Sequence, residues 1–461
     1  MTVLLNYAFT LFLIGWVLLS KKHQNSFVPL FISGFSGIPI YYFGRSSSGG
    51  IFPADIIAVT IIFRYGLIYG RYWVRIAVSK RVFLPFLFLT IWATFSTIYA
   101  ITQTDYGDKY FLFLLYGIGR WWSFAFFVLL FFSYQFDNND LLKIIKKLFF
   151  AFIIYGLFLV IHQYGLFNLS GREGLGPRIV ENTQNILDTY EIKSMFWGSN
   201  RACVGAICFT GFWLAILLWL YCKEHNWHRN ALILAILMIM GLIGSWSRSD
   251  FAALFVSFIL FILISKKKIG FKAKKIGFIV FALIFNLWAI ITILDINIEF
   301  PTLERYSVLL SDKWHEEGTG KFRFEMHKVI INDVIPANPN ILLTGLGANG
   351  FRILYGRQYN IWTNFAHNAY LHILVELGVI GLLLTLFWFY RILDVMKSFK
   401  MFTYNTAENI GYAILASFIL GRFISGYATD SFFAVDAMLP SNIMLFGFTS
   451  LLISLKFLQH S

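Results

Sequence analysis

Long apolar runs separated by short polar stretches dominate the chain. A helix needs about 20 mostly apolar residues to cross the hydrocarbon core of a bilayer, and about thirteen runs satisfy this requirement. They lie near 2–20, 27–43, 51–70, 82–100, 111–133, 148–167, 202–222, 230–246, 250–265, 276–294, 368–390, 409–427 and 438–456. The run 27–43 contains Gly and Pro and the run 250–265 is short, so a count of twelve also fits. The pattern predicts an all-α fold, a polytopic transmembrane bundle of about 12–13 spans.

Basic residues occupy alternate connections between these runs. The loop Arg71–Arg81 and the lysine-rich loop Lys266–Lys275 are the clearest cases, and Lys143 and Arg391 mark two further basic edges. Cytoplasmic loops of membrane proteins carry an excess of Lys and Arg. With thirteen spans every basic loop falls on one side, which predicts an outside N-terminus and an inside C-terminus.

Two predicted outside segments, 168–201 and 295–367, are too long for simple connectors. Loops of this length without a function are uncommon, and we expect the second to form a small domain on the membrane surface. The expected organisation is N-terminal helices with the first long loop (1–200), central helices (201–294), a large periplasmic loop (295–367) and C-terminal helices (368–461).

The composition excludes a water-soluble fold. Hydrophobic residues make up 58% and charged residues 13%, whereas soluble proteins have roughly 25% charged residues. We assign the net charge of +14 to cytoplasmic loops rather than to nucleic-acid binding. The three cysteines lack CxxC spacing, so neither a disulfide framework nor a zinc site is indicated. Met1–Ser20 lacks the features of a signal peptide and is expected to be the first span.

Arginines at the predicted outer ends of spans are the first candidate site residues. Arg248 follows the small residues Gly244, Ser245 and Ser247 and opens a span. A helix N-terminus together with a guanidinium suits a pyrophosphate; the alternative is a simple pair between Arg248 and Asp250. Arg201 has the same setting, and its alternative is an interfacial arginine whose charged end reaches water. For Arg323, in the large outer loop, the alternative is a solvated charge.

His367 stands immediately before the run 368–390, at the outer mouth of a predicted helix. An imidazole with a pKa near 6.5 suits a general base; the alternative is a helix cap or an interface residue. Glu376 lies about two and a half helical turns deeper and is expected to pair inside the bundle. His315, His327 and His372 are less favoured.

Three further arginines, Arg64, Arg120 and Arg422, lie within predicted spans. We expect them to pair inside the bundle, with Asp55, Asp430 or Asp436 as possible partners that the sequence does not assign. No carboxylate or histidine cluster has metal-ligand spacing, and no phosphate-binding GxxxxGK[ST] motif is present. No metal, cofactor or ATP-driven transport is therefore expected.

Several of these pieces occur in a familiar order: Ser247-Arg248-Ser249, then Arg323, Gly345-Leu-Gly347, His367-Asn-Ala-Tyr-Leu371 and Glu376-Leu-Gly378-Val-Ile-Gly381. This order resembles the O-antigen ligase and O-antigen polymerase superfamily, most strongly over 195–395. The resemblance implies a metal-independent, inverting glycosyltransferase of the bacterial inner membrane. It further implies an undecaprenyl-pyrophosphate-linked glycan donor and an active site that faces the periplasm.

Carried over from the family, Arg248 and Arg323 would hold the donor pyrophosphate and His367 would activate the acceptor hydroxyl. Arg201 corresponds to a less regular part of the family pattern. The sequence departs at Ser249-Asp250, where many relatives have Gly-Ala, and Asp250 places a negative charge near the phosphate site. The acceptor is either another lipid-linked repeat unit, to which a polymerase would add the growing chain, or lipid A–core.

Several functions remain open at this point. We favour a surface-polysaccharide polymerase, with a ligase to lipid A–core or a protein oligosaccharyltransferase as alternatives of the same chemistry. A flippase for lipid-linked glycans is the alternative from another functional class. In a flippase, Arg64, Arg120 and Arg422 would line a path for an anionic lipid. The absence of a visible internal repeat weighs against it. A structural scaffold ranks last, because it leaves the outer Arg and His residues unexplained.

Overall fold

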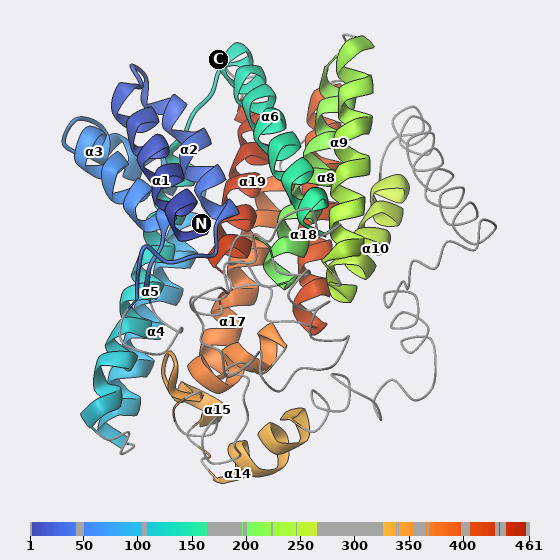
Figure 1. Ribbon diagram of the computed structural model, residues 1–461. Coiled ribbons are helices and arrows are strands. Elements are labelled where there is room, and N and C mark those ends of the chain that lie inside the picture. Colours follow the sequence, from blue (N-terminus) through green and yellow to red (C-terminus); the bar gives the residue numbers. More distant parts are fainter. Residues whose placement is uncertain are drawn as a thin grey trace.

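A bundle of long helices makes up most of the protein (Figure 1). The computed structural model describes residues 2–42, 50–103, 108–163, 196, 201–222, 225–245, 247–264, 326–337, 339, 341–351, 353, 366, 368–397, 406–428, 433 and 439–457. Within these residues the only sheet is a two-stranded hairpin of β1 (Tyr41–Tyr42) and β2 (Gly50–Ile51). The predicted all-α membrane bundle is confirmed.

The long helices overlap the predicted apolar runs. They are α1 (Thr2–Leu19), α3 (Pro53–Ser79), α4 (Phe83–Gln103), α5 (Asp108–Ser133), α6 (Asn138–Gln163), α8 (Arg201–Tyr221), α9 (His225–Gly244), α10 (Arg248–Ile264), α17 (Ala369–Lys397), α18 (Thr406–Ala428) and α19 (Leu439–Phe457). However, α3 continues through Ser79 and so includes most of the predicted loop Arg71–Arg81. Among the described helices, 7 are long and apolar enough to cross a membrane, and α1, α10, α18 and α19 contain shorter apolar stretches. The predicted run 276–294 lies outside the described residues.

The run 27–43 does not form the continuous helix that its composition predicted. A 3-10 turn, η1 (His23–Ser26), leads into the short α2 (Phe27–Ile32) and a second 3-10 turn, η2 (Ser33–Phe35), after which the chain is extended. Gly34 packs so closely on α19 that a Cβ atom would lie 2.7 Å from Ile443 Cγ2, and Pro39 cannot continue a helix. Because Phe27, Phe31 and their neighbours are buried, most of this broken segment is enclosed by neighbouring helices.

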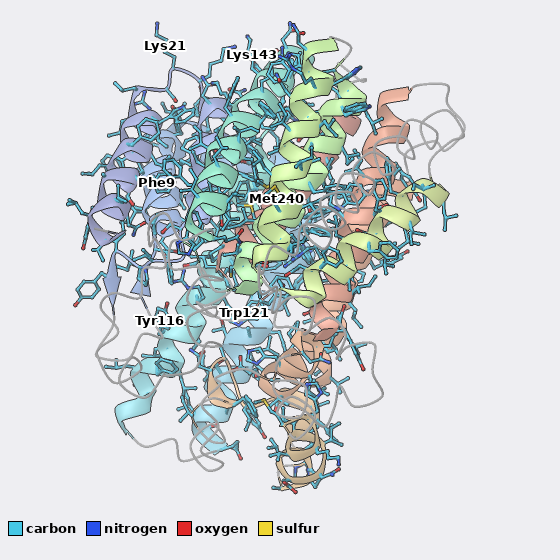
Figure 2. All side chains as sticks on the ribbon, turned by 45° about the vertical axis from the view of Figure 1, so that its right-hand side comes forward. Phe9, Lys21, Tyr116, Trp121, Lys143 and Met240 are labelled. Carbon is cyan, nitrogen blue, oxygen red and sulfur yellow. The ribbon has the colours of Figure 1, made fainter. Side chains whose placement is uncertain are left out.

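Three connections meet at one end of the bundle, and those between α1 and α2 and between α3 and α4 carry basic residues. Lys80, between α3 and α4, donates from Nζ to the carbonyl of Tyr134, between α5 and α6, over 2.6 Å. The Tyr134 hydroxyl also contacts Ser26 Oγ at 2.7 Å, which joins the α1–α2 connection to the same place. Figure 2 shows Lys21 and Lys143 at this end. We call it the basic end.

The core is built around α8, because 89% of the residues in its most apolar stretch are buried. It packs against α6, α9, α10, α18 and α19. A second aromatic centre joins α4, α5, α17 and α19 through Phe86, Trp121, Trp388 and Phe446. This packing holds the ends of the helices in fixed relative positions.

A smaller apolar cluster lies at the opposite end, where the described part of the predicted large loop 295–367 covers α17 (Figure 1). We call this part, the described residues between 326 and 366, the outer segment. That part includes a π-helical turn η4 (Ile330–Val334), α14 (Ile335–Ala337) and α15 (Ile341–Thr344). Met326 and Ile330 pack with Leu346, Ala366 and Val375. The outer segment is therefore docked on the bundle by its own apolar contacts.

Candidate functional site

The starts of α8 and α10 lie side by side at the end opposite the basic end. The end of α8 and the start of α9 are joined at the basic end, where His228 Nε2 lies 2.9 Å from the carbonyl of Cys222. Lys146 also lies over the Trp227 ring there, 4.7 Å from its centroid. Helix α8 runs toward the basic end and α9 runs away from it. The start of α8 and the end of α9 therefore both lie at the opposite end of the bundle.

Gly205 in the first turns of α8 explains how closely this helix approaches the start of α10. A Cβ atom at Gly205 would lie 2.5 Å from Asp250 Oδ2 and 2.7 Å from Ser247 Cβ. Any larger side chain would push the two helices apart. The backbones at Arg201 and Arg248, the first residues of α8 and α10, are thereby held in neighbouring turns.

A buried carboxylate lies directly beneath these helix starts. Asp250 accepts hydrogen bonds from Arg422 Nη1 at 3.0 Å and from Ser425 Oγ at 2.8 Å, both in α18. Ser247 Oγ donates to its second oxygen at 2.5 Å. Arg422 also bonds to Ser441 Oγ near the start of α19. Both charges are buried and paired, which is the condition under which an ion pair is tolerated in a low-dielectric interior.

This pair corrects the partners expected for the intramembrane arginines. Arg422 pairs with Asp250, which was not among the expected carboxylates. Arg120 pairs with Asp55 at 2.7 Å, in agreement with one of the expected partners. Arg64 donates to the carbonyl of Ser20 at 2.9 Å. The negative charge of Asp250 is therefore balanced inside the bundle.

The start of α17 is fixed by a side-chain cap. Asn368 Oδ1 accepts the backbone N–H groups of Tyr370 at 3.0 Å and Leu371 at 3.1 Å, so Asn368 is the N-cap. The Tyr370 hydroxyl donates to the carbonyl of Phe423 at 2.9 Å, next to Arg422. The capping role that was the alternative for His367 belongs to the following residue, Asn368.

The outer segment is tied to the same place. His327 Nε2 lies 3.0 Å from the carbonyl of Ala366, the residue before His367. Met326 and Ala366 also share the smaller apolar cluster. Described residues that neighbour Arg323 and His367 along the chain are thus brought together.

Helix α17 is broken at Gly378, where φ is 69° and ψ is −175°. The carbonyls released by this break are satisfied by other elements. Val375 accepts from the backbone N–H of Leu346 at 2.9 Å, and Glu376 accepts from that of Gly347 at 2.8 Å. Trp92 Nε1 in α4 donates to the carbonyl of Leu377 at 2.8 Å.

The two glycine-containing motifs, Gly345-Leu-Gly347 and Glu376-Leu-Gly378, therefore interlock. Gly345 and Gly347 have φ values of 81° and 77°. A Cβ at Gly345 would collide with the Glu376 carbonyl, and one at Gly378 with the Leu343 carbonyl. Ser96 Oγ of α4 adds a bond to the Thr344 carbonyl at 2.5 Å. These contacts attach the outer segment rigidly to α4 and α17.

The Glu376 side chain lies 3.4 Å from Nε2 of His372, one turn earlier in α17, and both side chains are buried. The expectation that Glu376 pairs within the bundle is confirmed. Among the described residues, no group of three or more His, Cys, Asp or Glu is arranged to hold a metal ion.

The predicted site residues themselves are placed only in part. Arg201 and Arg248 are the first residues of α8 and α10, and their side chains lie outside the described residues. Arg323 and His367 lie outside them entirely. Sequence reasoning missed the Asp250–Arg422 pair and the Asn368 cap; an Asn directly before an apolar run was a usable signal for the cap.

Residues 233–386 match the family model described as O-antigen ligase. The match includes the later part of α9, all of α10, the described outer segment and much of α17, whereas α8 and α18 lie outside it. It confirms the resemblance to the O-antigen ligase and polymerase superfamily. No curated protein matches the chain.

Proposed function

We propose, from the match of residues 233–386 to the O-antigen ligase family, that this chain is a membrane glycosyltransferase that acts on undecaprenyl-pyrophosphate-linked oligosaccharide. The reaction takes place at the end opposite the basic end, which faces the periplasm by the positive-inside rule. The observation that carries the proposal is the convergence of the starts of α8, α10 and α17 around one part of α18.

The donor pyrophosphate binds at the neighbouring starts of α8 and α10. Each start offers backbone N–H groups that point out of the helix end and the positive end of a helix dipole. Arg201 and Arg248 add a guanidinium at each start, and Arg323 approaches from the predicted large loop. Because Arg422 balances Asp250, the carboxylate below does not repel the phosphates.

In the reaction, His367 takes the proton from the acceptor hydroxyl, whose oxygen attacks the anomeric carbon of the donor. The bond from that carbon to the pyrophosphate oxygen breaks, and the glycan is transferred with inversion. Arg248 and Arg323 stabilise the negative charge that develops on the departing pyrophosphate. The Asn368 cap and the Tyr370–Phe423 bond hold the start of α17 next to His367. The glycosyl-pyrophosphate bond supplies the driving energy.

The acceptor distinguishes the two members of this class. We favour another lipid-linked repeat unit as the acceptor of the growing chain, which makes the protein a polymerase. The family description, O-antigen ligase, favours the ligase, whose acceptor would be lipid A–core. In a deletion strain, loss of the length ladder with a single capped unit retained identifies a polymerase. Loss of all capped lipid A with accumulated lipid-linked polymer identifies a ligase.

A flippase is less well supported by the geometry. Arg120 and Arg422 are paired with Asp55 and Asp250, and Arg64 is bonded to a backbone carbonyl. These arginines stabilise contacts between helices and do not leave a row of uncompensated charges for an anionic lipid.

The test is glycan transfer by purified protein in detergent, where no sealed membrane exists. His367→Ala is expected to lower the rate by about 100-fold or more, the usual contribution of a general base. Arg248→Ala and Arg323→Ala should lower it comparably, whereas Arg229→Ala, an exposed arginine at the start of α9, is the matched control and should remain active. If all three site variants transfer glycan at the wild-type rate, the proposed mechanism is wrong.

A further inference from the structure

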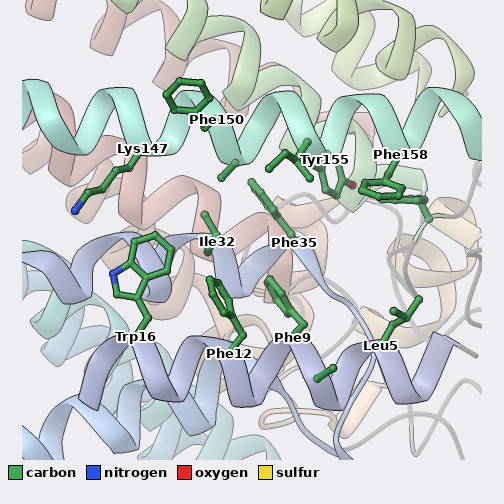
Figure 3. Close-up of a pocket in the computed structure, with 14 residues that line it drawn as sticks. Leu5, Phe9, Phe12, Trp16, Ile32, Phe35, Lys147, Phe150, Tyr155 and Phe158 are labelled. Atoms are coloured by element: carbon green, nitrogen blue, oxygen red, sulfur yellow. The ribbon is translucent and has the colours of Figure 1, made fainter. Parts of the chain in front are cut away.

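A groove of about 640 Å³ separates α1 from α6 on the outside of the bundle (Figure 3). Its floor is the broken segment, which contributes Ile32 and Phe35. Phe9 and Phe12 of α1 and Ile154 of α6 form its walls. The surface of this groove is almost wholly apolar, so its natural contents are hydrocarbon.

One end of the groove carries a charge. Among the described residues that line it, Lys147 of α6 alone is charged, and its ammonium lies 5.9 Å from the centroid of the Trp16 ring. Figure 3 shows Lys147 and Trp16 facing each other across the mouth of the groove. Lys147 follows Lys143 by one helical turn, so the charged end of the groove is at the basic end of the bundle.

The length of the groove matches one leaflet of a bilayer. From Lys147 to Phe158 the axis of α6 advances about 17 Å at 1.5 Å per residue. Half of the hydrocarbon core of a bilayer measures about 15 Å. A lipid acyl chain that enters the groove beside Lys147 therefore ends near the middle of the membrane.

We propose that this groove is a binding site for an anionic phospholipid of the leaflet at the basic end. The phosphate lies against Lys147, and one acyl chain lies between α1 and α6 over Phe35. Apolar contact alone does not select a lipid, since bulk lipid tails are as apolar as the groove. Selection comes from the ammonium at the mouth together with the leaflet-length channel below it.

The polyprenyl carrier is a poor occupant of this groove. Its eleven isoprenoid units far exceed one leaflet, and its pyrophosphate is placed by the proposed reaction at the opposite end of the bundle. The lipid site does not depend on that reaction, because it is formed mainly by α1, the broken segment and α6.

The experiment measures lipid retention by native mass spectrometry of the full chain, exchanged into micelles that contain phosphatidylglycerol or phosphatidylcholine. The wild type should retain phosphatidylglycerol preferentially. Lys147→Gln should lower that retention by about fivefold, since one lysine near the surface contributes about 1 kcal/mol toward an anionic lipid. Lys143→Gln is the matched control: it removes the same charge from the same helix, but its side chain is 71% exposed and outside the groove.

A second variant tests the channel without altering any charge. Ala151→Phe places a ring inside the groove and should reduce retention of phosphatidylglycerol as strongly as Lys147→Gln, with an unchanged size-exclusion profile. Equal losses in the Lys143 and Lys147 variants would show diffuse attraction and overturn the site. Retention of phosphatidylcholine at the same level, or Lys147-dependent displacement of phosphatidylglycerol by undecaprenyl phosphate, would also overturn it.

Discussion

Asp250 in α10 and Arg422 in α18 form a buried ion pair, with 3.0 Å between Oδ1 and Nη1. Asp250 lies two residues after Arg248, so the pair connects the candidate donor end of α10 to the core. Ser425 and Ser247 complete the hydrogen bonds of the carboxylate. The pair therefore sets where α10 begins relative to α18.

Removing either partner of this pair should destabilise the protein. Asp250→Leu or Arg422→Met leaves one uncompensated buried charge and should lower the free energy of unfolding by about 3–5 kcal/mol. The double variant removes both charges and should recover much of the loss. Thermal unfolding in detergent measures all three. Single variants that melt at the wild-type temperature would contradict the assigned pair.

Gly378 should not tolerate a side chain. Gly378→Ala forces a non-glycine residue to a φ of 69° and drives its Cβ into the Leu343 carbonyl. This backbone conformation is essentially restricted to glycine and costs another residue about 1–3 kcal/mol, and the collision separates the two interlocked motifs. Gly119→Ala in α5 is the control, because nothing lies within 4 Å of a Cβ there. The measurement is the melting temperature, with limited proteolysis to detect release of the outer segment.

The Asn368 cap gives a prediction that separates stability from position. Asn368→Ala should lower the free energy of unfolding by about 1 kcal/mol, because it removes the N-cap of α17. It should also lower glycan transfer, because the capped start of α17 holds the neighbouring His367 in position. Asn368→Asp restores an oxygen acceptor and should recover both properties. If Asn368→Ala transfers glycan normally while it is less stable, the cap does not position the site.

Lys80 should make stability depend on pH. It lies between α3 and α4, and burial lowers its pKa from the ordinary 10.5 to about 7. Between these two values the unfolded chain binds more protons than the folded one, so the free energy of unfolding rises with pH across that window. At and below pH 7 the folded protein carries the cost of a buried ammonium.

Lys80→Met removes this proton-linked cost. The melting temperature of the variant minus that of the wild type should therefore be most positive near pH 7 and below, and should fall as pH rises toward 10. The lost bond to the Tyr134 carbonyl adds an offset that does not vary with pH. Melting curves at several pH values test this, and a difference that is independent of pH would refute the shifted pKa.

Much of the fold was predictable because lipid leaves few choices. In hydrocarbon every backbone polar group must be bonded within its own segment, so a long apolar run becomes a helix. The runs 51–70, 202–222 and 438–456 thus predicted α3, α8 and α19. The run 27–43 was the exception, because burial under α1, α6 and α19 allowed its glycines and prolines to end the helix early.

The sequence by itself determined the membrane setting, the alternation of basic connections and the family motifs, since these depend on composition and short spacings. Only the tertiary structure decided which carboxylate meets which arginine, and that Gly345 and Gly378 belong to one interlock. Those relationships join residues far apart along the chain through close packing and buried hydrogen bonds. A linear pattern does not contain them, because they arise only when neighbouring helices take up their positions.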